Sequence, residues 1–378
     1  SNTGGENHFT IITISDTPID KDVIWVGTDD GNVQVTIDNG DTWDNVRPNI
    51  VGVPQKTWVS RVEASKHKKG RAYVSFDNHR FDDNKPYVFM TDDYGKSWKN
   101  ITSDLPKDYS VYVIKEDYID ENLLFVGTEK SVYFTINQGK IWEKLGSNLP
   151  SVAIHDLVIH PRDGDLIAGT HGKSIWILDD ISPLRNLNFN SNKIIPSRES
   201  TKWIKINTGR KQPYFEFRGE NPPYGAIINF YSKTEIKGKI TITNSSESNL
   251  YKRDISLNNG LNRFIWPFEL DRNSDELINY KTKFINLVDD LKDVVIDKKN
   301  LKQYDFKNLN SFDEINKLRK SFLDDYGMYA NGKKIFGDKL YESYVVKPGK
   351  YKLFLELENG ESFSEIISVR EDPLKTSN

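Results

Sequence analysis

The chain has 378 residues, enough for two or three domains that each bury a core. Its 37% hydrophobic and 28% charged residues are typical of a globular protein, and a formal net charge of -3 gives no electrostatic attraction to nucleic acid or anionic membrane surfaces. The absence of cysteine excludes disulfides, thiolate nucleophiles and cysteine zinc sites.

Four related segments fill the first half of the chain; they begin at Val23, Arg71, Leu123 and Asp165. Each has an apolar strand that ends near Gly-Thr or in an equivalent position, a polar turn and a second alternating strand. A further strand lies between the segments, at 59–65, 111–117 and 155–161. Four strands per repeat predict the blades of a β-propeller over residues 1–185.

An eight-residue box closes the first three repeats. It reads TIDNGDTW at 36–43, TDDYGKSW at 91–98 and TINQGKIW at 135–142. The carboxylate of such a box can accept backbone N–H groups at a hairpin bend, the glycine permits positive φ, and the tryptophan can fold back as an apolar plug. The third copy has Asn where the others have Asp. We therefore predict a structural role for the box residues, which are Asp38, Gly40, Trp43, Asp93, Gly95, Trp98, Asn137, Gly139 and Trp142.

The second half has a different organisation. Residues 186–202 are rich in Asn and Ser and are expected to form a linker. Alternating strands predict a fibronectin-like or immunoglobulin-like β-sandwich made of residues 203–272 and 343–371. Apolar residues at helical spacing predict a small helical insertion over 273–342. The expected fold class is thus all-β, with about four propeller blades, a sandwich and this insertion.

The boxes carry a family resemblance. T-x-D-x-G-x-T/S-W is similar to the Asp-box, or BNR repeat. Together with VIWVGTDDGNVQVT, PYVFMTDDYGKSW, HDLVIHPRDGDLIAGTHGKSIWILDDI and PYFEFRGENPPYGA it resembles a family of large exported bacterial sortilin-like repeat proteins, many labelled glycosyl hydrolase. The resemblance covers about residues 9–235 and 344–373. It implies export, a C-terminal position in a longer protein, and upstream blades of the same protein that complete a larger propeller.

Blade topology separates two sets of loops. Turns between the second and third strands lie at the same end as the links between blades, and the boxes lie at the opposite end. We expect the first end, the propeller mouth, to bind a polypeptide or a carbohydrate. Its expected binding face consists of Trp58, His79, Arg80, Tyr109, Glu129, His155 and His171.

The sequence contains no complete catalytic constellation. A sialidase needs a cluster of arginines, and this face offers too few. An inverting glycosidase needs two carboxyl groups about 6.5–9.5 Å apart, which Asp29 or Asp30 could form with Asp82 or Asp83. Histidine spacing indicates no metal site, and no cofactor motif is present.

Three functions remain open at this level. The leading hypothesis is a non-catalytic binding or scaffold portion of an exported protein. The alternative is a BNR-type glycoside hydrolase whose acid and base are shared with upstream blades. In the third, the sandwich and helices assemble a larger surface complex. No nucleic acid partner, membrane span, metal or cofactor is expected.

Overall fold

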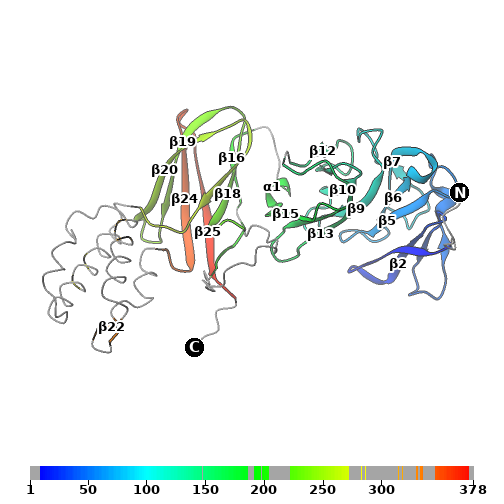
Figure 1. Cartoon of the computed structure of the whole chain (residues 1–378), viewed down its shortest axis with the longest axis horizontal. Coiled ribbons are helices and arrows are strands. Elements are labelled where there is room, and N and C mark those ends of the chain that lie inside the picture. Colours follow the sequence, from blue (N-terminus) through cyan, green and yellow to red (C-terminus); the bar gives the residue numbers. More distant parts are fainter. Residues whose placement is uncertain are drawn as a thin grey trace. The chain divides into compact units, whose positions relative to one another are not determined.

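The computed structural model describes residues 9–146, 148–185, 191–196, 198–203, 222–271 and 345–373, with a few positions between 282 and 334. The chain divides into two compact units, Ser1–Leu187 and Asn188–Asn378 (Figure 1).

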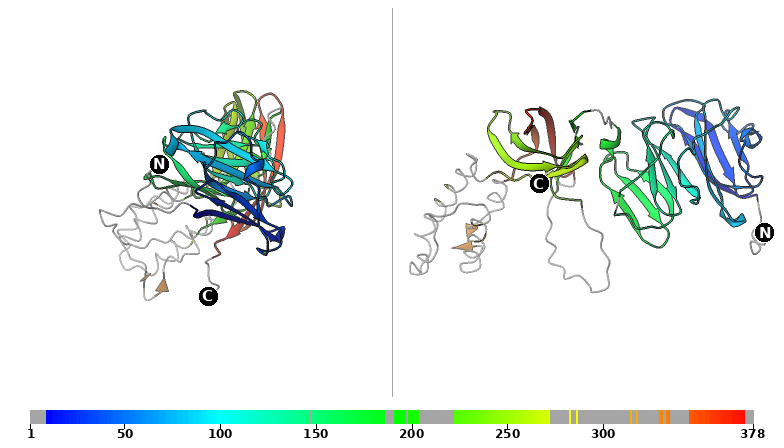
Figure 2. Two further views of the ribbon diagram at one scale, coloured as in Figure 1. Left: turned by 90° about the vertical axis from the view of Figure 1, so that its right-hand side faces the viewer. Right: turned by 90° about the horizontal axis from the view of Figure 1, so that it is seen from above.

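The first unit consists of consecutive antiparallel sheets, as the repeats predict (Figures 1 and 2). We name them blades 1 to 4. Blade 1 contains β1 (Ile11–Thr17), β2 (Asp20–Thr28), β3 (Val33–Thr36) and β4 (Asp44–Asn45). Blade 2 contains β5 (Trp58–Ala64), β6 (Ala72–Asn78), β7 (Asp83–Thr91) and β8 (Lys99–Asn100). Blade 3 contains β9 (Val111–Glu116), β10 (Leu124–Thr128), β11 (Val132–Thr135) and β12 (Glu143–Lys144). Blade 4 contains β13 (Ile154–Ile159), β14 (Leu166–Thr170) and β15 (Ile175–Leu178). The expected β-propeller blades are confirmed.

Three short helices accompany the blades: η1 (Arg47–Asn49), η2 (His79–Phe81) and α1 (Ser182–Arg185). The last of them follows blade 4 and is attached to blade 3. The guanidinium of Arg185 donates from Nε and Nη2 to the two carboxylate oxygens of the fully buried Asp117, at 2.8 and 2.9 Å. A bidentate pair of this kind fixes orientation as well as distance.

Neighbouring blades approach each other too closely for a side chain at two repeated glycines. A Cβ atom at Gly27 in β2 would lie 2.4 Å from Cγ1 of Val59 in blade 2. One at Gly127 in β10 would lie 2.7 Å from the carbonyl oxygen of Ile154 in blade 4. Gly27 and Gly127 therefore allow the first strand of the next blade to pack against them.

Apolar side chains fill the space between successive blades. Val33, Val35 and Trp25 of blade 1 pack with Val59 and Phe76 of blade 2. Equivalent clusters join blade 2 to blade 3 and blade 3 to blade 4. The middle strand β10 is buried at all five of its positions, because it is covered by a neighbouring blade on each face.

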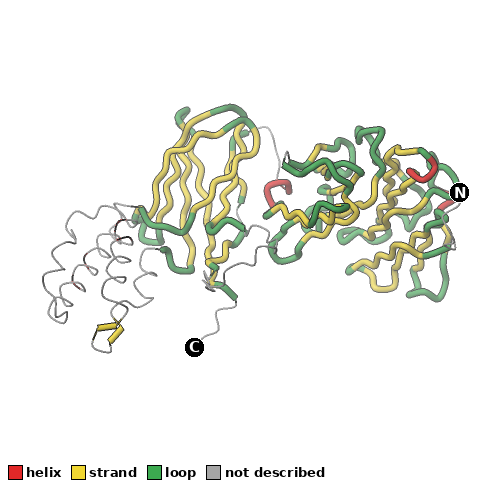
Figure 3. Tube along the Cα trace, in the orientation of Figure 1, coloured by secondary structure: helices red, strands yellow, loops and turns green. Residues whose placement is uncertain are grey.

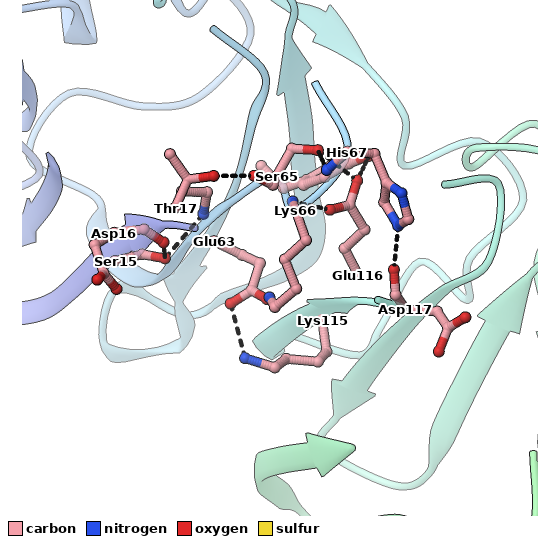
Figure 4. A network of polar contacts seen from close by, with 12 residues as sticks. Ser15, Asp16, Thr17, Glu63, Ser65, Lys66, His67, Lys115, Glu116 and Asp117 are labelled. Atoms are coloured by element: carbon pink, nitrogen blue, oxygen red, sulfur yellow. Dashed lines mark hydrogen bonds and ion pairs between the residues drawn. The ribbon is translucent and has the colours of Figure 1, made fainter. Parts of the chain in front are cut away.

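A buried polar network also joins blade 2 to blade 3 (Figure 4). The carboxylate of Glu116 is fully buried and accepts hydrogen bonds from the Ser65 hydroxyl at 2.9 Å, the Lys66 backbone N–H at 2.6 Å and the Tyr73 hydroxyl at 2.9 Å. Burial raises the pKa of Glu116, and these donors oppose that rise. Because Glu116 and its donors lie on different blades, the network fixes how the two blades meet.

The box tryptophans do not all behave as predicted. Trp142 is buried, and its Nε1 donates to the Ile101 carbonyl of blade 2 at 2.9 Å. Trp98 packs edge-on against Trp25 of blade 1, with ring centroids 6.0 Å apart. Each of these rings thus covers the preceding blade. Trp43 belongs to the first described blade and is 41% exposed, so its prediction as an apolar plug is wrong in this structure.

Apart from one two-residue hairpin, the described strands of the second unit form a smaller and a larger sheet (Figure 3). The smaller has the order β16 (Lys193–Ile195), β18 (Ala226–Ser232) and β21 (Gly260–Trp266). The larger has the order β17 (Ser200–Lys202), β25 (Ser362–Glu371), β24 (Gly349–Leu357), β19 (Ile236–Thr243) and β20 (Asn249–Leu257). β17 pairs with β25 in parallel, and the other pairs are antiparallel.

Both sheets contribute to one hydrophobic cluster. Phe230 and Trp266 come from the smaller sheet, and Ile240, Leu353 and Ile367 come from the larger. The assignment to a fibronectin-like or immunoglobulin-like sandwich stays a prediction. Two short strands lie within the expected linker 186–202: β16 pairs with β18, and β17 pairs with β25.

The predicted helical insertion at 273–342 lies almost entirely outside the described residues. Within it the structure describes the two-residue strands β22 (Tyr329–Ala330) and β23 (Lys333–Lys334), which pair with each other.

The contrast between the buried Trp142 and the exposed Trp43 gives a first prediction. Trp142→Ala removes a buried ring and its hydrogen bond and should lower the free energy of unfolding by roughly 3–5 kcal/mol. Trp43→Ala should cost about 1 kcal/mol, because much of that ring is already in water. Urea denaturation of both variants, followed by circular dichroism, measures the difference. Equal losses would contradict the packing described for the box tryptophans.

A second prediction concerns the Glu116 network. Tyr73→Phe removes one donor from a buried carboxylate and should cost roughly 1–3 kcal/mol of unfolding free energy. Tyr133→Phe is the control, because that ring packs against the same hydrophobic cluster and its hydroxyl has no hydrogen bond within the described part of the chain. Urea denaturation of the two variants should separate them. A loss no larger than that of the control would show that the Tyr73 hydroxyl contributes nothing to stability.

Candidate binding pocket at the propeller mouth

The carboxylates of the boxes are engaged in turns. Asp38 accepts hydrogen bonds from the Thr36 hydroxyl at 2.7 Å, the Thr42 backbone N–H at 2.9 Å and the Thr42 hydroxyl at 2.6 Å. The Gly40 N–H donates to the Thr36 hydroxyl, and Gly40 has a φ of 100°. The bend therefore needs an acceptor at the Asp position and a glycine two residues later.

The other two boxes repeat this arrangement. Asp93 accepts from Thr91 and twice from Ser97. Asn137 accepts the Thr135 hydroxyl at 2.8 Å and the N–H groups of Lys140 and Ile141 at 3.0 Å each. An amide oxygen thus makes the same bend as a carboxylate oxygen, which supports the structural role predicted for the boxes.

Hydrogen bonding also explains the acidity of these carboxyl groups. Donation from Thr42, first by its hydroxyl and then by its N–H, lowers the pKa of Asp38 to about 2. The pKa of Asp93 is lowered as well: slight burial opposes the change, and the Ser97 and Thr91 donors outweigh it. Both groups are ionised at neutral pH and cannot serve as general acids there.

A pocket of about 500 Å³ lies at the opposite end of the blades. We call it the mouth pocket. Its lining comes from all four blades and consists of Ile12, Trp58, Ser60, Asp77, His79, Arg80, Tyr112, Glu129, Ala153, His155 and His171.

A repeated backbone irregularity builds part of this pocket. The register between the first two strands of each blade shifts by one residue, next to Gly27 in blade 1, Gly127 in blade 3 and Gly169 in blade 4. Such a β-bulge turns one extra side chain out of the ladder. The extra residues are Ile12, Ser60, Tyr112 and His155, and all four line the mouth pocket.

Aromatic and imidazole rings form a continuous row along the pocket. Tyr112 stacks on His155 with centroids 4.5 Å apart and an interplanar angle of 25°. His79 contacts Tyr112 edge-on, with ring centroids 6.3 Å apart, and the His171 and His155 ring centroids are 5.3 Å apart. The row joins blades 2, 3 and 4 and offers flat ring surfaces at the mouth.

Charged groups surround this row. Asp77 is 8% exposed, and its Oδ2 lies 2.6 Å from His79 Nδ1. The guanidinium of Arg80 lies over the Trp58 ring, 3.9 Å from its centroid. Glu129 is half-buried, and its carboxylate has no hydrogen bond or ion pair to any residue that the structure describes.

The pKa shifts in the pocket follow from burial and these charges. Burial, with the negative charges of Asp77 and Glu129, raises the pKa of Tyr112 to about 12. Burial and the neighbouring His171 lower the pKa of His155. At neutral pH the stacked pair is therefore an uncharged phenol on an uncharged imidazole.

Six of the seven residues expected on the binding face line the pocket. Tyr109 is the exception; its ring is covered by Lys130, whose Nζ lies 4.7 Å from the ring centroid. Sequence reasoning missed Asp77 and Tyr112. The position of Tyr112 could have been found by aligning it with His155, since both stand at the start of the first strand of a repeat.

The four carboxylates considered for catalysis do not line the pocket. Asp29 accepts the N–H groups of Phe9 and Thr10, both at 2.9 Å. Asp30 accepts from Thr28 and Asn32 within its own turn.

The other two of these carboxylates stand in the loop between β6 and β7. Asp82 has a left-handed φ of 58° at the end of η2. Asp83 accepts from Asn78 and Tyr87, which lower its pKa against the effect of burial. The carboxylates that do line the pocket are Asp77 and Glu129.

Within the part of the chain that the structure describes, no three His, Asp or Glu side chains are placed to hold a metal ion. The same residues include no helix long and apolar enough to cross a membrane.

Residues 86–265 match a protein-family model described as sortilin, neurotensin receptor 3. This stretch is similar to sortilin. The match begins inside blade 2 and continues through blades 3 and 4 into the second unit. A comparison with curated proteins finds no match.

Several solved structures resemble the chain. YCF48 bound to a D1 peptide has 21% identity and a TM-score of 0.36, over 46% of this chain and 52% of that chain. YCF48 from Cyanidioschyzon merolae has 16% identity and a TM-score of 0.31, over 45% and 56%. A GH74 xyloglucanase from Xanthomonas campestris has 12% identity and a TM-score of 0.36, over 69% and 38%. This chain therefore spans only about half, or less, of each of those proteins.

The box geometry gives a third prediction. Asp93→Asn should change the free energy of unfolding little, because Asn137 makes the same bend. Asp93→Ala removes the acceptor of three hydrogen bonds and should cost roughly 1–2 kcal/mol. Urea denaturation distinguishes the two, with Asp41→Ala as an exposed control from another box. If the Asn and Ala variants lose the same stability, the hydrogen bonds do not hold the bend.

Proposed function

We propose that the sortilin-like blades are a non-catalytic binding portion of an exported protein and that they recognise a polypeptide segment at the mouth pocket. The observation that carries this proposal is the set of four bulged residues, one from each blade, that face a single pocket. A bulge repeated at one position supplies a different side chain from each repeat. Such an arrangement suits recognition of an extended ligand that crosses several blades.

The composition of the pocket supports binding rather than turnover. The flat rings lie near a guanidinium group, that of Arg80, and both aromatic residues and arginine are enriched at protein recognition surfaces. The carboxylate of Asp77 is already engaged by His79, through the backbone N–H at 3.1 Å and the Nδ1 atom at 2.6 Å.

The exposed Trp43 supports a related proposal. Trp98 and Trp142 each cover the preceding blade, and Trp43 has the same place in its own repeat. We propose that a further blade of the same exported protein covers Trp43 and continues the wall of the mouth pocket beyond Ile12.

A glycoside hydrolase remains the second candidate, because two carboxylates, Asp77 and Glu129, line the same pocket. In that case they would act with groups on further blades. Release of reducing sugar from a panel of polysaccharides, lost on Asp77→Asn, would favour this candidate and refute the non-catalytic function.

Selection of random dodecapeptides displayed on phage against the whole chain tests the proposed function. Selected peptides should bind at least about tenfold more weakly to His155→Ala, because the variant removes one ring from the row. His160→Ala is the matched control, since His160 directly follows the far end of the same strand.

The results of this selection discriminate sharply. Peptides that depend on His155 and not on His160 support recognition at the mouth pocket. Failure to select any peptide, or equal weakening by both variants, would refute it. Binding to a glycan array in place of peptides, with the same dependence on His155, would reassign the ligand to carbohydrate.

A further inference from the structure

Resting on the proposed function, we propose that the mouth pocket takes a cationic side chain of its polypeptide ligand, a lysine or an arginine. The ammonium or guanidinium group would lie beside Glu129 and Asp77, and the carbon stem would lie along the rings of Tyr112 and His155.

The first reason is the negative charge inside the pocket. Asp77 is almost fully buried and Glu129 is half-buried, so water screens their charges less than it screens exposed groups. Both carboxylates act on the same hydroxyl, that of Tyr112. The pocket thus concentrates negative potential at one place beside a ring surface.

The second reason is that the nearby cations already have other contacts. Arg61 is paired with Asp156, and its Nη2 lies 2.8 Å from Oδ1. Arg80 is exposed and lies on the Trp58 ring, while Lys130 lies on Tyr109. None of the described cationic side chains pairs with the half-buried carboxylate of Glu129. This carboxylate is therefore available to a ligand.

The third reason is the chemistry of the row of rings. A cation is attracted to the face of an aromatic ring, and a long aliphatic stem packs against flat apolar surface. Because the pKa of His155 is lowered, its imidazole is neutral at pH 7 and does not repel a bound cation. His79 donates from Nδ1 to the Asp77 carboxylate, which holds that carboxylate at the edge of the pocket.

Arrays of dodecapeptides with randomised flanks and one fixed central residue test this inference. The central residue is lysine, arginine, norleucine or glutamate; norleucine has a straight side chain of similar length to lysine without the charge. Wild-type protein should bind the lysine and arginine arrays about tenfold more strongly than the norleucine array. This preference should fall below about twofold in Glu129→Gln.

The matched control is Glu143→Gln, an exposed position on the outermost strand of the same blade as Glu129. It should keep the wild-type preference, and circular dichroism checks that both variants are folded. Equal binding of the lysine and norleucine arrays, stronger binding of the glutamate array, or a preference that survives Glu129→Gln would overturn the inference and leave peptide binding intact. Absence of binding to all four arrays would overturn the proposed function together with the inference.

Discussion

The close approach of neighbouring blades is the constraint on which the first unit depends. At Gly27 and Gly127 no space exists for even a Cβ atom, because the inner strand of the next blade occupies it. In blade 2 the equivalent ladder position is Ser75, whose hydroxyl bonds to Ser60 at 2.8 Å. The first strand of every blade shifts by one residue beside this position, and the side chain that the shift displaces lines the mouth pocket. The same ladder position therefore borders both the core between blades and the wall of the pocket.

Much of the first unit could be predicted from the sequence, because its repeats carry local signals. The hydroxyl, acceptor, glycine and tryptophan of each box mark a bend through side-chain hydrogen bonds within eight residues, and such a signal needs no tertiary information. The order of turns along each repeat also assigns the polar loops to two opposite ends of the blades, the mouth and the end that carries the boxes. Six of the seven face residues follow from that topology.

The features that were missed depend on contacts between distant residues. Nothing in the stretch around Tyr112 marks a bulge, since the shift arises from pairing with β10 and packing against blade 4. Asp77 ends a strand that is buried at every position and looks like an ordinary core strand in the sequence. Trp43 stands in a complete box and is nevertheless exposed, because no described blade packs against its ring, and a local pattern does not show such packing. Ser200–Lys202 form β17, which pairs with β25 much later in the sequence. The residues around β17 do not show this pairing, and they therefore predicted a linker.

The order of strands in the second unit has a consequence for biosynthesis. β24 lies in the interior of the larger sheet, between β19 and β25, although it is encoded after the long segment that follows Trp266. The blades are built from strands adjacent in sequence, so each can assemble as it leaves the ribosome. The larger sheet cannot form until β24 and β25 have been translated. Until then the edge of β19 stays unpaired, and a ribosome that stalls before β24 releases a chain whose blades are folded and whose second unit is not.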